Sequence, residues 1–102
     1  MLRTKKLFLK KRYLLISEIG LGSFSVVYIA YDLKTNNFYA IKVFDNDSIN
    51  EAKIENKLYH KINHPNIIKV CDFFMHDITI DNILYKYYVL VFKIINNTYK
   101  YL

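Results

Sequence analysis

Two short stretches near the start of the chain combine residue types suited to binding a phosphate group. The first, Ile19–Val27, reads Ile-Gly-Leu-Gly-Ser-Phe-Ser-Val-Val, and the second, Tyr39–Lys42, reads Tyr-Ala-Ile-Lys. The glycines at Gly20 and Gly22 let the backbone approach a ligand with no side chain in the way. The lysine then offers a compact positive charge. This order predicts a site that grips phosphate between backbone amides and the Lys42 ammonium.

Three apolar segments are expected to position these residues. Tyr13–Ile19, Ser25–Asp32 and Phe38–Phe44 are rich in aromatic and branched aliphatic residues and are separated by Gly, Asn or Asp. This pattern predicts three strands, the last two joined by a polar turn. Alternation along the third strand places Ala40 and Lys42 on the same face. A small residue beside the cation leaves room for a ligand.

A helix is expected after the third strand. Ser48 and Glu51 have the S-x-x-E spacing of a capping box, so the helix should begin near Ser48. The residue before Pro65 is disfavoured in the helical conformation, so the helix should end by about Asn63.

One face of this helix is expected to pack on the sheet. Its apolar stripe recurs every four residues and consists of Ile54, Leu58 and Ile62. Two glutamates lie one turn apart, and either could face the sheet. Because the capping box accounts for Glu51, Glu55 is the better partner for Lys42.

The second half of the chain predicts two further strands. Ile67–Phe74 and Tyr87–Phe92 are apolar, and Met75–Lys86 between them is expected to form a loop or an extended hairpin. The predicted fold is therefore α+β: a five-stranded antiparallel sheet with one main helix. At 102 residues the chain allows one small domain.

Basic residues are concentrated in the first twelve positions. The net charge of +6 comes largely from this leader, which contains Arg3, Lys5, Lys6, Lys10, Lys11 and Arg12. The leader could contact a nucleic acid or a membrane, or act in targeting; alternatively it is a solvated tail preceding a domain at 13–102. We favour the tail, because the leader's apolar residues are too few to define a surface.

The cysteine and histidine residues indicate the cellular compartment and whether a disulfide or a metal site is expected. Cys71 is the single cysteine, so no internal disulfide forms, and its apolar neighbours predict a buried thiol. Lys93 interrupts the best apolar run, so no membrane partner is expected. We expect an intracellular protein, cytoplasmic or nuclear. No metal site is expected, because proline ends the helix at the second of the histidines His60, His64 and His76.

The order of these features resembles the N-terminal, ATP-binding lobe of eukaryotic protein kinases. Their loop reads G-x-G-x-x-G-x-V and their lysine follows in V-A-I-K; here Ser25 stands at the third glycine, and a His-Pro-Asn sequence follows the helix. The Phe24–Ser25 pair, Tyr31–Leu33 and Val91–Phe92 are most similar to SR-protein kinases, which phosphorylate Arg/Ser-rich splicing factors. The resemblance runs from Tyr13 to the C-terminus.

This resemblance implies a role for each loop residue. Backbone amides of the loop would cover the ATP triphosphate, and Phe24 would cap the loop tip. The loop residues are Gly20, Leu21, Gly22, Ser23, Phe24 and Ser25. The adenine ring would be sandwiched by Ile19, Val27 and Ala40.

It also implies how the rest of the site is built. Lys42 would pair with the α- and β-phosphates and be held by Glu55, ten residues before the proline of His-Pro-Asn. Phe92 would be the gatekeeper, and the backbone of Lys93 and Ile95 would form the adenine-contacting hinge. Two residues depart from the pattern: Lys93 replaces a frequent glutamate, and Tyr59 replaces a usual leucine or methionine.

The catalytic residues of the family are not in these 102 residues. The two glycines both lie in the loop, so no Asp-Phe-Gly is present, nor is there a His-Arg-Asp. We expect an ATP-binding lobe of a serine/threonine kinase that does not catalyse alone, with Mg²⁺ needed only beside a complete C-terminal lobe. A second hypothesis is a non-catalytic kinase-like module that docks a protein through its lobe-facing surface. A third, RNA binding by the leader, is the least favoured.

Overall fold

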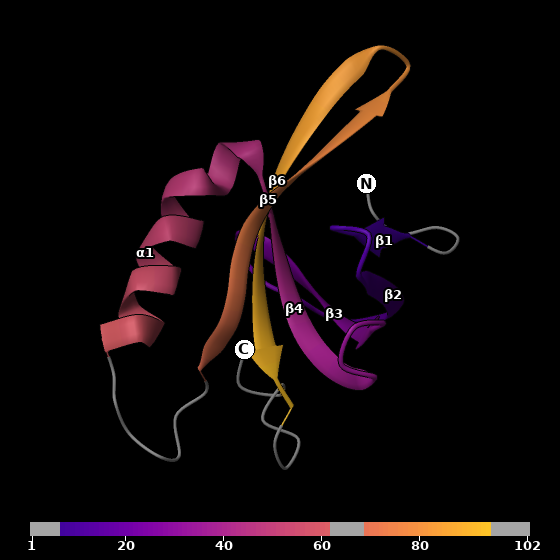
Figure 1. Cartoon of the computed structure of the whole chain (residues 1–102). Helices are drawn as coiled ribbons and strands as arrows, with labels where there is room; N and C mark the ends of the chain where they lie inside the picture. Colours follow the sequence, from indigo (N-terminus) through magenta and orange to yellow (C-terminus); the bar gives the residue numbers. More distant parts are fainter. Residues whose placement is uncertain (1–6, 62–68, 95–102) are drawn as a thin grey trace.

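The computed structural model describes residues 7–61 and 69–94. They form one antiparallel sheet with the strand order β1-β2-β3-β4-β6-β5 and one main helix (Figure 1). The predicted α+β fold is confirmed. The elements are β1 Phe8–Leu9, β2 Tyr13–Leu21, β3 Ser25–Asp32, β4 Asn37–Asp45, the 3₁₀ turn η1 Asn46–Ser48, α1 Ile49–Lys61, β5 Val70–Ile80 and β6 Ile83–Lys93. The expectations for the His-Pro-Asn sequence, Ile62 and Ile95 lie outside the described residues.

The sheet has six strands rather than the expected five, because part of the basic leader is folded. Phe8 and Leu9 pair with Leu14 and Tyr13 of β2. Lys10 and the residue after it adopt left-handed backbone conformations and reverse the chain between these strands. Leu9 is fully buried. Residues 7–12 are therefore part of the domain and not a solvated tail.

Apolar side chains cover both faces of the sheet. One cluster lies on the face away from the helix and includes Leu9, Tyr13, Val26, Tyr28, Ala30, Ile41, Val43, Tyr87, Val89 and Val91. The other lies under α1 and consists of Ala40, Phe44, Ala52, Tyr88, Leu90 and Phe92. A strand in the middle of this sheet therefore buries alternate residues on opposite faces, as the pleat requires.

The sheet curls so that its two ends meet, although β1 and β5 stand at opposite ends of the strand order. Asp72 of β5 accepts a hydrogen bond from the Tyr13 hydroxyl at 3.1 Å and pairs with Lys10 at 3.2 Å. The Tyr13 ring stacks on Phe74 with 5.9 Å between ring centroids. The backbone amide of Lys10 donates to His76 Nδ1 at 3.3 Å. These contacts hold the start of the domain against β5.

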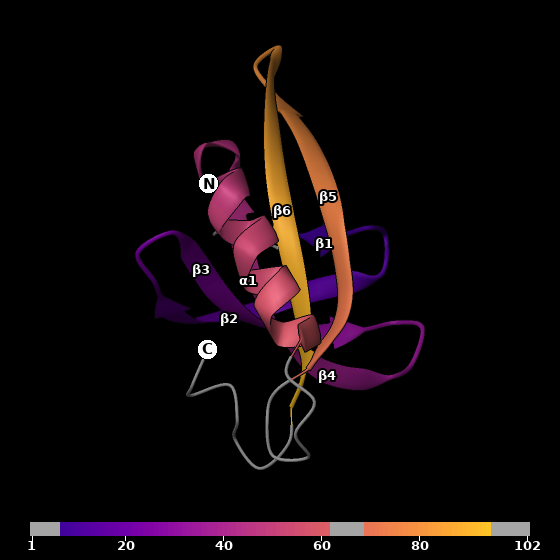
Figure 2. The same ribbon diagram turned by 90° about the vertical axis from the view of Figure 1, so that its left-hand side faces the viewer.

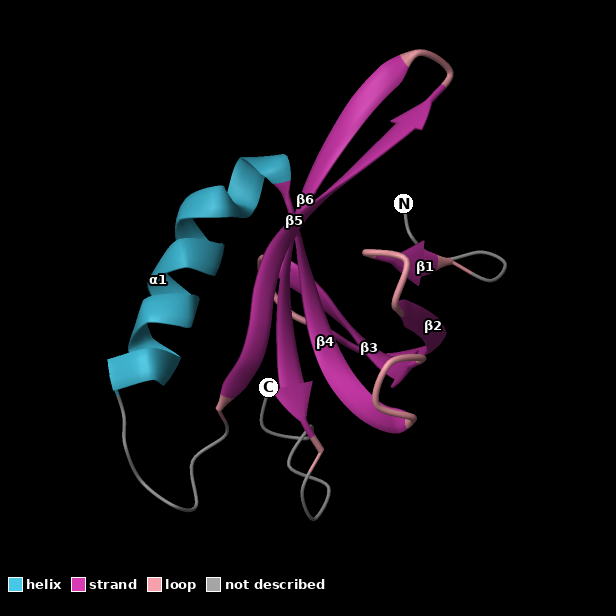
Figure 3. Cartoon of the chain, in the orientation of Figure 1, coloured by secondary structure: helices cyan, strands magenta, loops and turns pink. Residues whose placement is uncertain are grey.

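The helix lies across one face of the sheet (Figures 2 and 3). It begins one residue after Ser48, close to the predicted start, and its buried residue is Ala52. The predicted contact stripe is wrong: Ile54 and Leu58 are 60% and 53% exposed. Tyr59 packs on the cluster under the helix instead. A four-residue period identifies an apolar stripe, but it does not say whether the sheet covers that stripe.

Two further details differ from or refine the expectations. Met75–Lys86 belongs to a long β5–β6 hairpin whose tip projects beyond the rest of the sheet (Figure 1). Asp81 and Asn82 form its turn with φ of 51° and 66°, the left-handed region that a two-residue hairpin turn uses. Cys71, expected to be buried, is exposed because the β5–β6 register shifts between Val70 and Asp72 and turns it outward.

No helix in the described ranges combines the length and apolar character needed to cross a membrane.

Candidate functional site

The sheet register brings the phosphate-binding candidates onto one face. Val27 of β3 lies opposite Lys42 of β4, and Gly20 of β2 lies opposite Val27. Ala40 lies opposite Phe92 of β6. Because directly opposed residues of antiparallel strands point to the same side, these five residues share the face that carries α1.

Lys42 and Glu55 are in direct contact, with Lys42 Nζ paired to Glu55 Oε1. The Lys42 side chain is 10% exposed and that of Glu55 24% exposed. The Lys42 ammonium also lies 5.7 Å from the centroid of the Phe44 ring, within range of a cation–π interaction. A sheet lysine is thus paired with a helix glutamate in a partly buried environment, where Coulomb interactions are stronger than in water.

The two glycines of the β2–β3 turn have different surroundings. The Gly22 amide donates to the Ser25 carbonyl at 2.8 Å, closing the turn. A Cβ added at Gly22 would lie 3.1 Å from Ser25 Oγ, so the turn itself favours glycine there. A Cβ at Gly20 would lie 3.8 Å from Val27 Cβ, an ordinary contact. Packing within the fold therefore does not require glycine at position 20.

The remaining loop residues lie at the surface. Leu21, Gly22, Ser23 and Phe24 are exposed, with Phe24 at the tip of the turn, whereas Ser25 is buried.

The three expected adenine contacts are not equally accessible. Val27 and Ala40 are 6% and 1% exposed, while Ile19 is 37% exposed. Ile19 sits where the β2–β3 register shifts, between Glu18 and Gly20. Val27 and Ala40 are therefore buried on the face of the sheet that carries α1, whereas Ile19 is partly exposed to solvent.

The C-terminal end of β6 lies beside the start of β4. Phe92 is fully buried, and the Tyr59 ring of α1 meets it edge-on with centroids 5.0 Å apart. Lys93 lies opposite Tyr39 and is exposed. A cavity of about 320 Å³ here is lined by Asn37, Phe38, Tyr39, Lys93 and Ile94. The expected hinge residue Lys93 therefore borders a hollow where β4 begins and β6 ends.

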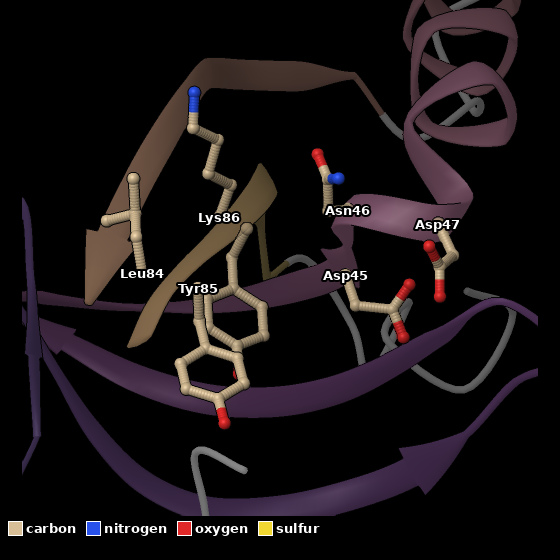
Figure 4. A pocket seen from close by; sticks show the side chains of 7 residues that line it. Asp45, Asn46, Asp47, Leu84, Tyr85 and Lys86 are labelled. Atoms are coloured by element: carbon tan, nitrogen blue, oxygen red, sulfur yellow. The ribbon is translucent and has the colours of Figure 1, made fainter. Parts of the chain in front are cut away.

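A larger cavity of about 470 Å³ lies away from these residues, at the base of the β5–β6 hairpin (Figure 4). Its lining residues are Asp45, Asn46, Asp47, Leu84, Tyr85, Lys86 and Tyr87. Asp45 lies opposite Tyr87 on the face of the sheet away from Lys42. Burial raises the pKa of Tyr87, and the neighbouring Tyr85 and Asp45 raise it further. This hollow contains none of the expected site residues.

A buried ion pair that the sequence analysis did not predict joins Arg12 to Asp32, at the end of β3. Arg12 Nε and its terminal nitrogen each donate to an oxygen of the Asp32 carboxylate at 2.7 Å. The Thr35 hydroxyl and the Lys34 amide also donate to it, at 2.7 and 2.9 Å. The Arg12 guanidinium holds the pKa of this fully buried carboxyl well below its usual range. The available signal was an aspartate ending an apolar strand three residues before a threonine, a turn pattern.

A Mg²⁺ ion would need several oxygen ligands gathered in one place. Within 7–61 and 69–94 no group of three or more Asp, Glu, His or Cys side chains is arranged to hold a metal ion. The described residues therefore do not fit a Mg²⁺ site of their own.

Comparison with known proteins gives one family. The family described as "Protein kinase domain" matches residues 13–101. A probable myosin light chain kinase of Dictyostelium discoideum is 39% identical over 64 residues, which cover 61% of this chain and 20% of that protein. The human serine/threonine-protein kinase tousled-like 1 is 35% identical over 79 residues, covering 68% of this chain and 10% of that protein. The chain thus spans a tenth to a fifth of the length of these curated relatives.

Solved structures show the same fold. A crystal structure of a kinase domain is similar with a TM-score of 0.71 and 27% identity, covering 88% of this chain and 26% of that one. Rad53 residues 1–466, solved in complex with AMP-PNP, is similar with a TM-score of 0.61 and 23% identity, covering 84% of this chain and 21% of that one. The second likeness supports the fold alone.

Proposed function

Because this chain belongs to the protein kinase domain family, we propose that residues 13–102 act as the ATP-binding lobe of a serine/threonine protein kinase. The observation that carries this proposal is the Lys42–Glu55 ion pair. It lies on the face that also presents Gly20, Val27 and Ala40.

In this proposal Lys42 meets the α- and β-phosphates of ATP while Glu55 keeps its ammonium aimed at them. The backbone amides of the β2–β3 turn contact the phosphates, and Gly20 provides the space for that approach. Lys42 is nearly buried, so its charge acts through a medium less polar than water.

The base of ATP is assigned to the other end of the same face. Ile19, Val27 and Ala40 enclose the adenine ring, Phe92 limits the depth of the pocket, and the backbone after β6 receives the ring edge. Lys93 is the described part of that hinge.

Phosphoryl transfer is not assigned to these residues alone. In protein kinases a catalytic-loop aspartate accepts the substrate proton, and the Asp-Phe-Gly aspartate and a catalytic-loop asparagine hold Mg²⁺. The 102 residues contain neither His-Arg-Asp nor Asp-Phe-Gly. We propose that they bind ATP and do not transfer phosphate by themselves.

The substrate class has narrower support. The Phe24–Ser25 pair of the loop is the feature in favour of Arg/Ser-rich protein substrates. The curated relatives described above are of the myosin light chain kinase and tousled-like types, and they lend this subfamily no support.

The test replaces Lys42 by methionine, which keeps the apolar stem and removes the charge. The affinity of the purified chain for ATP is measured by titration calorimetry. A charged hydrogen bond of about 1.5–3 kcal/mol corresponds to a roughly ten- to hundredfold loss of affinity. The matched control is Lys86→Met, an exposed lysine on the β5–β6 hairpin, which should leave affinity unchanged. Equal affinities for the wild type and Lys42→Met would overturn the proposal.

One observation favours the second candidate function, a non-catalytic interaction module. Ile54 and Leu58 leave an apolar stripe exposed on α1, and such surfaces mark interaction sites. The two functions separate in cells. If the effect of the protein survives Lys42→Met but is lost when Ile54 and Leu58 are replaced by glutamine, the module explains it and nucleotide binding does not.

A further inference from the structure

The β5–β6 hairpin extends past the end of the strand that lies beside it. β4 pairs with residues 87–93 of β6 and ends at Asp45, whereas β6 begins at Ile83. Residues 83–86 therefore have β5 on one edge and, in the described part of the chain, no strand on the other. At about 3.3 Å per residue this free edge is roughly 13 Å long. Unpaired amide and carbonyl groups on such an edge can pair with a further extended segment.

The hollow at the base of the hairpin lies along this free edge. Its volume is about 470 Å³, and it is lined by residues 84–87 of β6 and by residues 45–47, where the chain leaves the sheet toward α1 (Figure 4). The space beside β6 beyond the end of β4 is thus open. An added strand needs room of this kind next to an unpaired edge.

The side chains at the base of the free edge are acidic. Asp45 and Asp47 are both exposed, and Asp45 precedes η1 without making a capping hydrogen bond. Among the described residues, neither carboxylate forms an ion pair or a side-chain hydrogen bond. The Lys86 side chain points away from both of them (Figure 4). Two carboxylates without a counter-charge favour a cationic group in this hollow.

The face of the hairpin next to these carboxylates is apolar. Asp45 lies opposite Tyr87, so both point to the same side of the sheet. Alternation along β6 places Tyr85 and Ile83 on that side as well. Their side chains are 40% and 55% exposed. A strand added along the edge therefore meets apolar side chains toward the tip of the hairpin and carboxylates at its base.

We propose that the free edge of β6, residues 83–86, is a docking site for an extended segment of a partner protein, which joins the sheet as a further strand. The segment carries apolar side chains at alternate positions, against Tyr85 and Ile83. On the same face it carries a lysine or arginine, which lies beside Asp45 and Asp47. Main-chain hydrogen bonds provide the binding, and the carboxylates select the basic residue. Asp45 lies on the face opposite Lys42, so this inference does not depend on ATP binding.

The probe is a fluorescein-labelled nonapeptide in which leucine alternates with threonine and the central residue, on the leucine face, is arginine. Its sequence is symmetric, so it presents the same pattern in either direction of the added strand. A second probe has glutamine at the centre. Binding of each probe to the purified chain is measured by fluorescence anisotropy. We expect the arginine probe to bind about fivefold more tightly, as for an exposed ion pair.

The carboxylates are tested with two double variants that remove the same charge. Asp45→Asn combined with Asp47→Asn should reduce the preference for arginine to less than about twofold. Asp77→Asn combined with Asp81→Asn is the matched control, because these aspartates are also exposed and belong to the same hairpin but do not line the hollow. The control should keep the full preference. An equal preference in the wild type and in the Asp45/Asp47 variant, or an equal loss in both variants, refutes the proposal.

Strand addition is tested with two N-methylated forms of the arginine probe. One is methylated at the threonine amides and the other at the leucine and arginine amides. Neighbouring residues of a strand direct their amides to opposite edges, so one form loses its hydrogen bonds to β6 and the other keeps them. We expect the affinities of the two forms to differ by about tenfold. Equal affinities would overturn the added strand, as would an unmethylated arginine probe that binds more weakly than about 1 mM.

A second copy of the chain is the competing occupant of this edge. Sedimentation equilibrium of the chain without peptide distinguishes it, and we expect a monomer. A dimer that Ile83→Thr dissociates would show that the free edge pairs with another copy, and the partner segment would be wrong. Threonine keeps the strand propensity of this position, so loss of the dimer would reflect the lost apolar contact.

Discussion

Breaking the Arg12–Asp32 ion pair should destabilise the domain far more than breaking an exposed pair. Asp32 is fully buried and accepts hydrogen bonds from Arg12, Lys34 and Thr35. Arg12→Gln removes both bonds of the guanidinium and leaves the carboxylate with two neutral donors. An uncompensated buried charge of this kind costs about 3–5 kcal/mol. Because the Arg12 side chain is 25% exposed, water replaces part of its contribution, and we expect a loss of about 2–4 kcal/mol.

The assay is urea unfolding followed by circular dichroism at neutral pH. The control is Lys10→Gln, because Lys10 pairs with Asp72 while its own side chain is 47% exposed. Exposed pairs contribute less than about 1 kcal/mol. Arg12→Lys adds a third comparison, since it keeps the charge but loses the two-pronged geometry. If Arg12→Gln and Lys10→Gln lose the same free energy of unfolding, the burial of Asp32 does not determine the strength of its pair.

The pH dependence of the free energy of unfolding provides an independent test of the Arg12–Asp32 ion pair. The Arg12 guanidinium depresses the pKa of Asp32 in the folded state, whereas in the unfolded chain it is about 3.9. The stabilisation is therefore fully present above about pH 4 and is lost as pH falls below that value toward the folded pKa. Replacing Asp32 by Asn should flatten this acidic loss. A variant that loses stability below pH 4 as steeply as the wild type would contradict the assignment.

Two further predictions concern the loop and the leader. Gly20→Ala should change the free energy of unfolding by less than about 0.5 kcal/mol yet weaken ATP binding, because the added Cβ meets only Val27 at 3.8 Å. Gly22→Ala should instead destabilise the fold by about 1 kcal/mol, because its Cβ would crowd Ser25 Oγ at 3.1 Å; the reverse order would show that Gly20 is the structural glycine. Leu9→Ala should lower the free energy of unfolding by about 2–4 kcal/mol in the same urea assay, since Leu9 is fully buried. A loss below about 0.5 kcal/mol would show that residues 7–12 behave as a solvated tail.

The sequence predicted the strands of the middle of the sheet well because each is a run of β-prone apolar residues bounded by Gly, Asn or Asp. Ser25–Asp32 was predicted with the bounds of β3, and the third predicted strand differs from β4 by one residue at each end. The face shared by Ala40 and Lys42 follows from the alternating direction of side chains along a strand. These features are local, so strand propensity and the alternating direction of side chains suffice to predict them.

Features that depend on distant partners could not be predicted in this way. A two-residue strand such as β1 has no period to recognise, and its burial depends on the curl that brings β5 over it. Arg12 looked like one more basic leader residue until the fold placed Asp32 beside it. Cys71 was expected inside because its neighbours read as a strand, but β5 is an edge strand with a register shift at that point. In each case tertiary contacts decide what the local pattern leaves open.

The rotation of α1 about its axis shows which of two local patterns prevails. At 100° per residue, Ile54 and Leu58 are centred roughly 80° away from Glu55, so the sheet cannot receive the stripe and the glutamate equally. Burying both apolar side chains would contribute about 1.5–3 kcal/mol for each if they were otherwise fully exposed, and they are already partly covered. That rotation would also leave Lys42, 8% exposed, without its counter-charge, which costs about 3–5 kcal/mol, and would move Tyr59 off Phe92. The two amounts are comparable. The observed rotation keeps both the ion pair and the Tyr59–Phe92 contact and leaves the stripe exposed, so these two contacts together outweigh burial of the stripe.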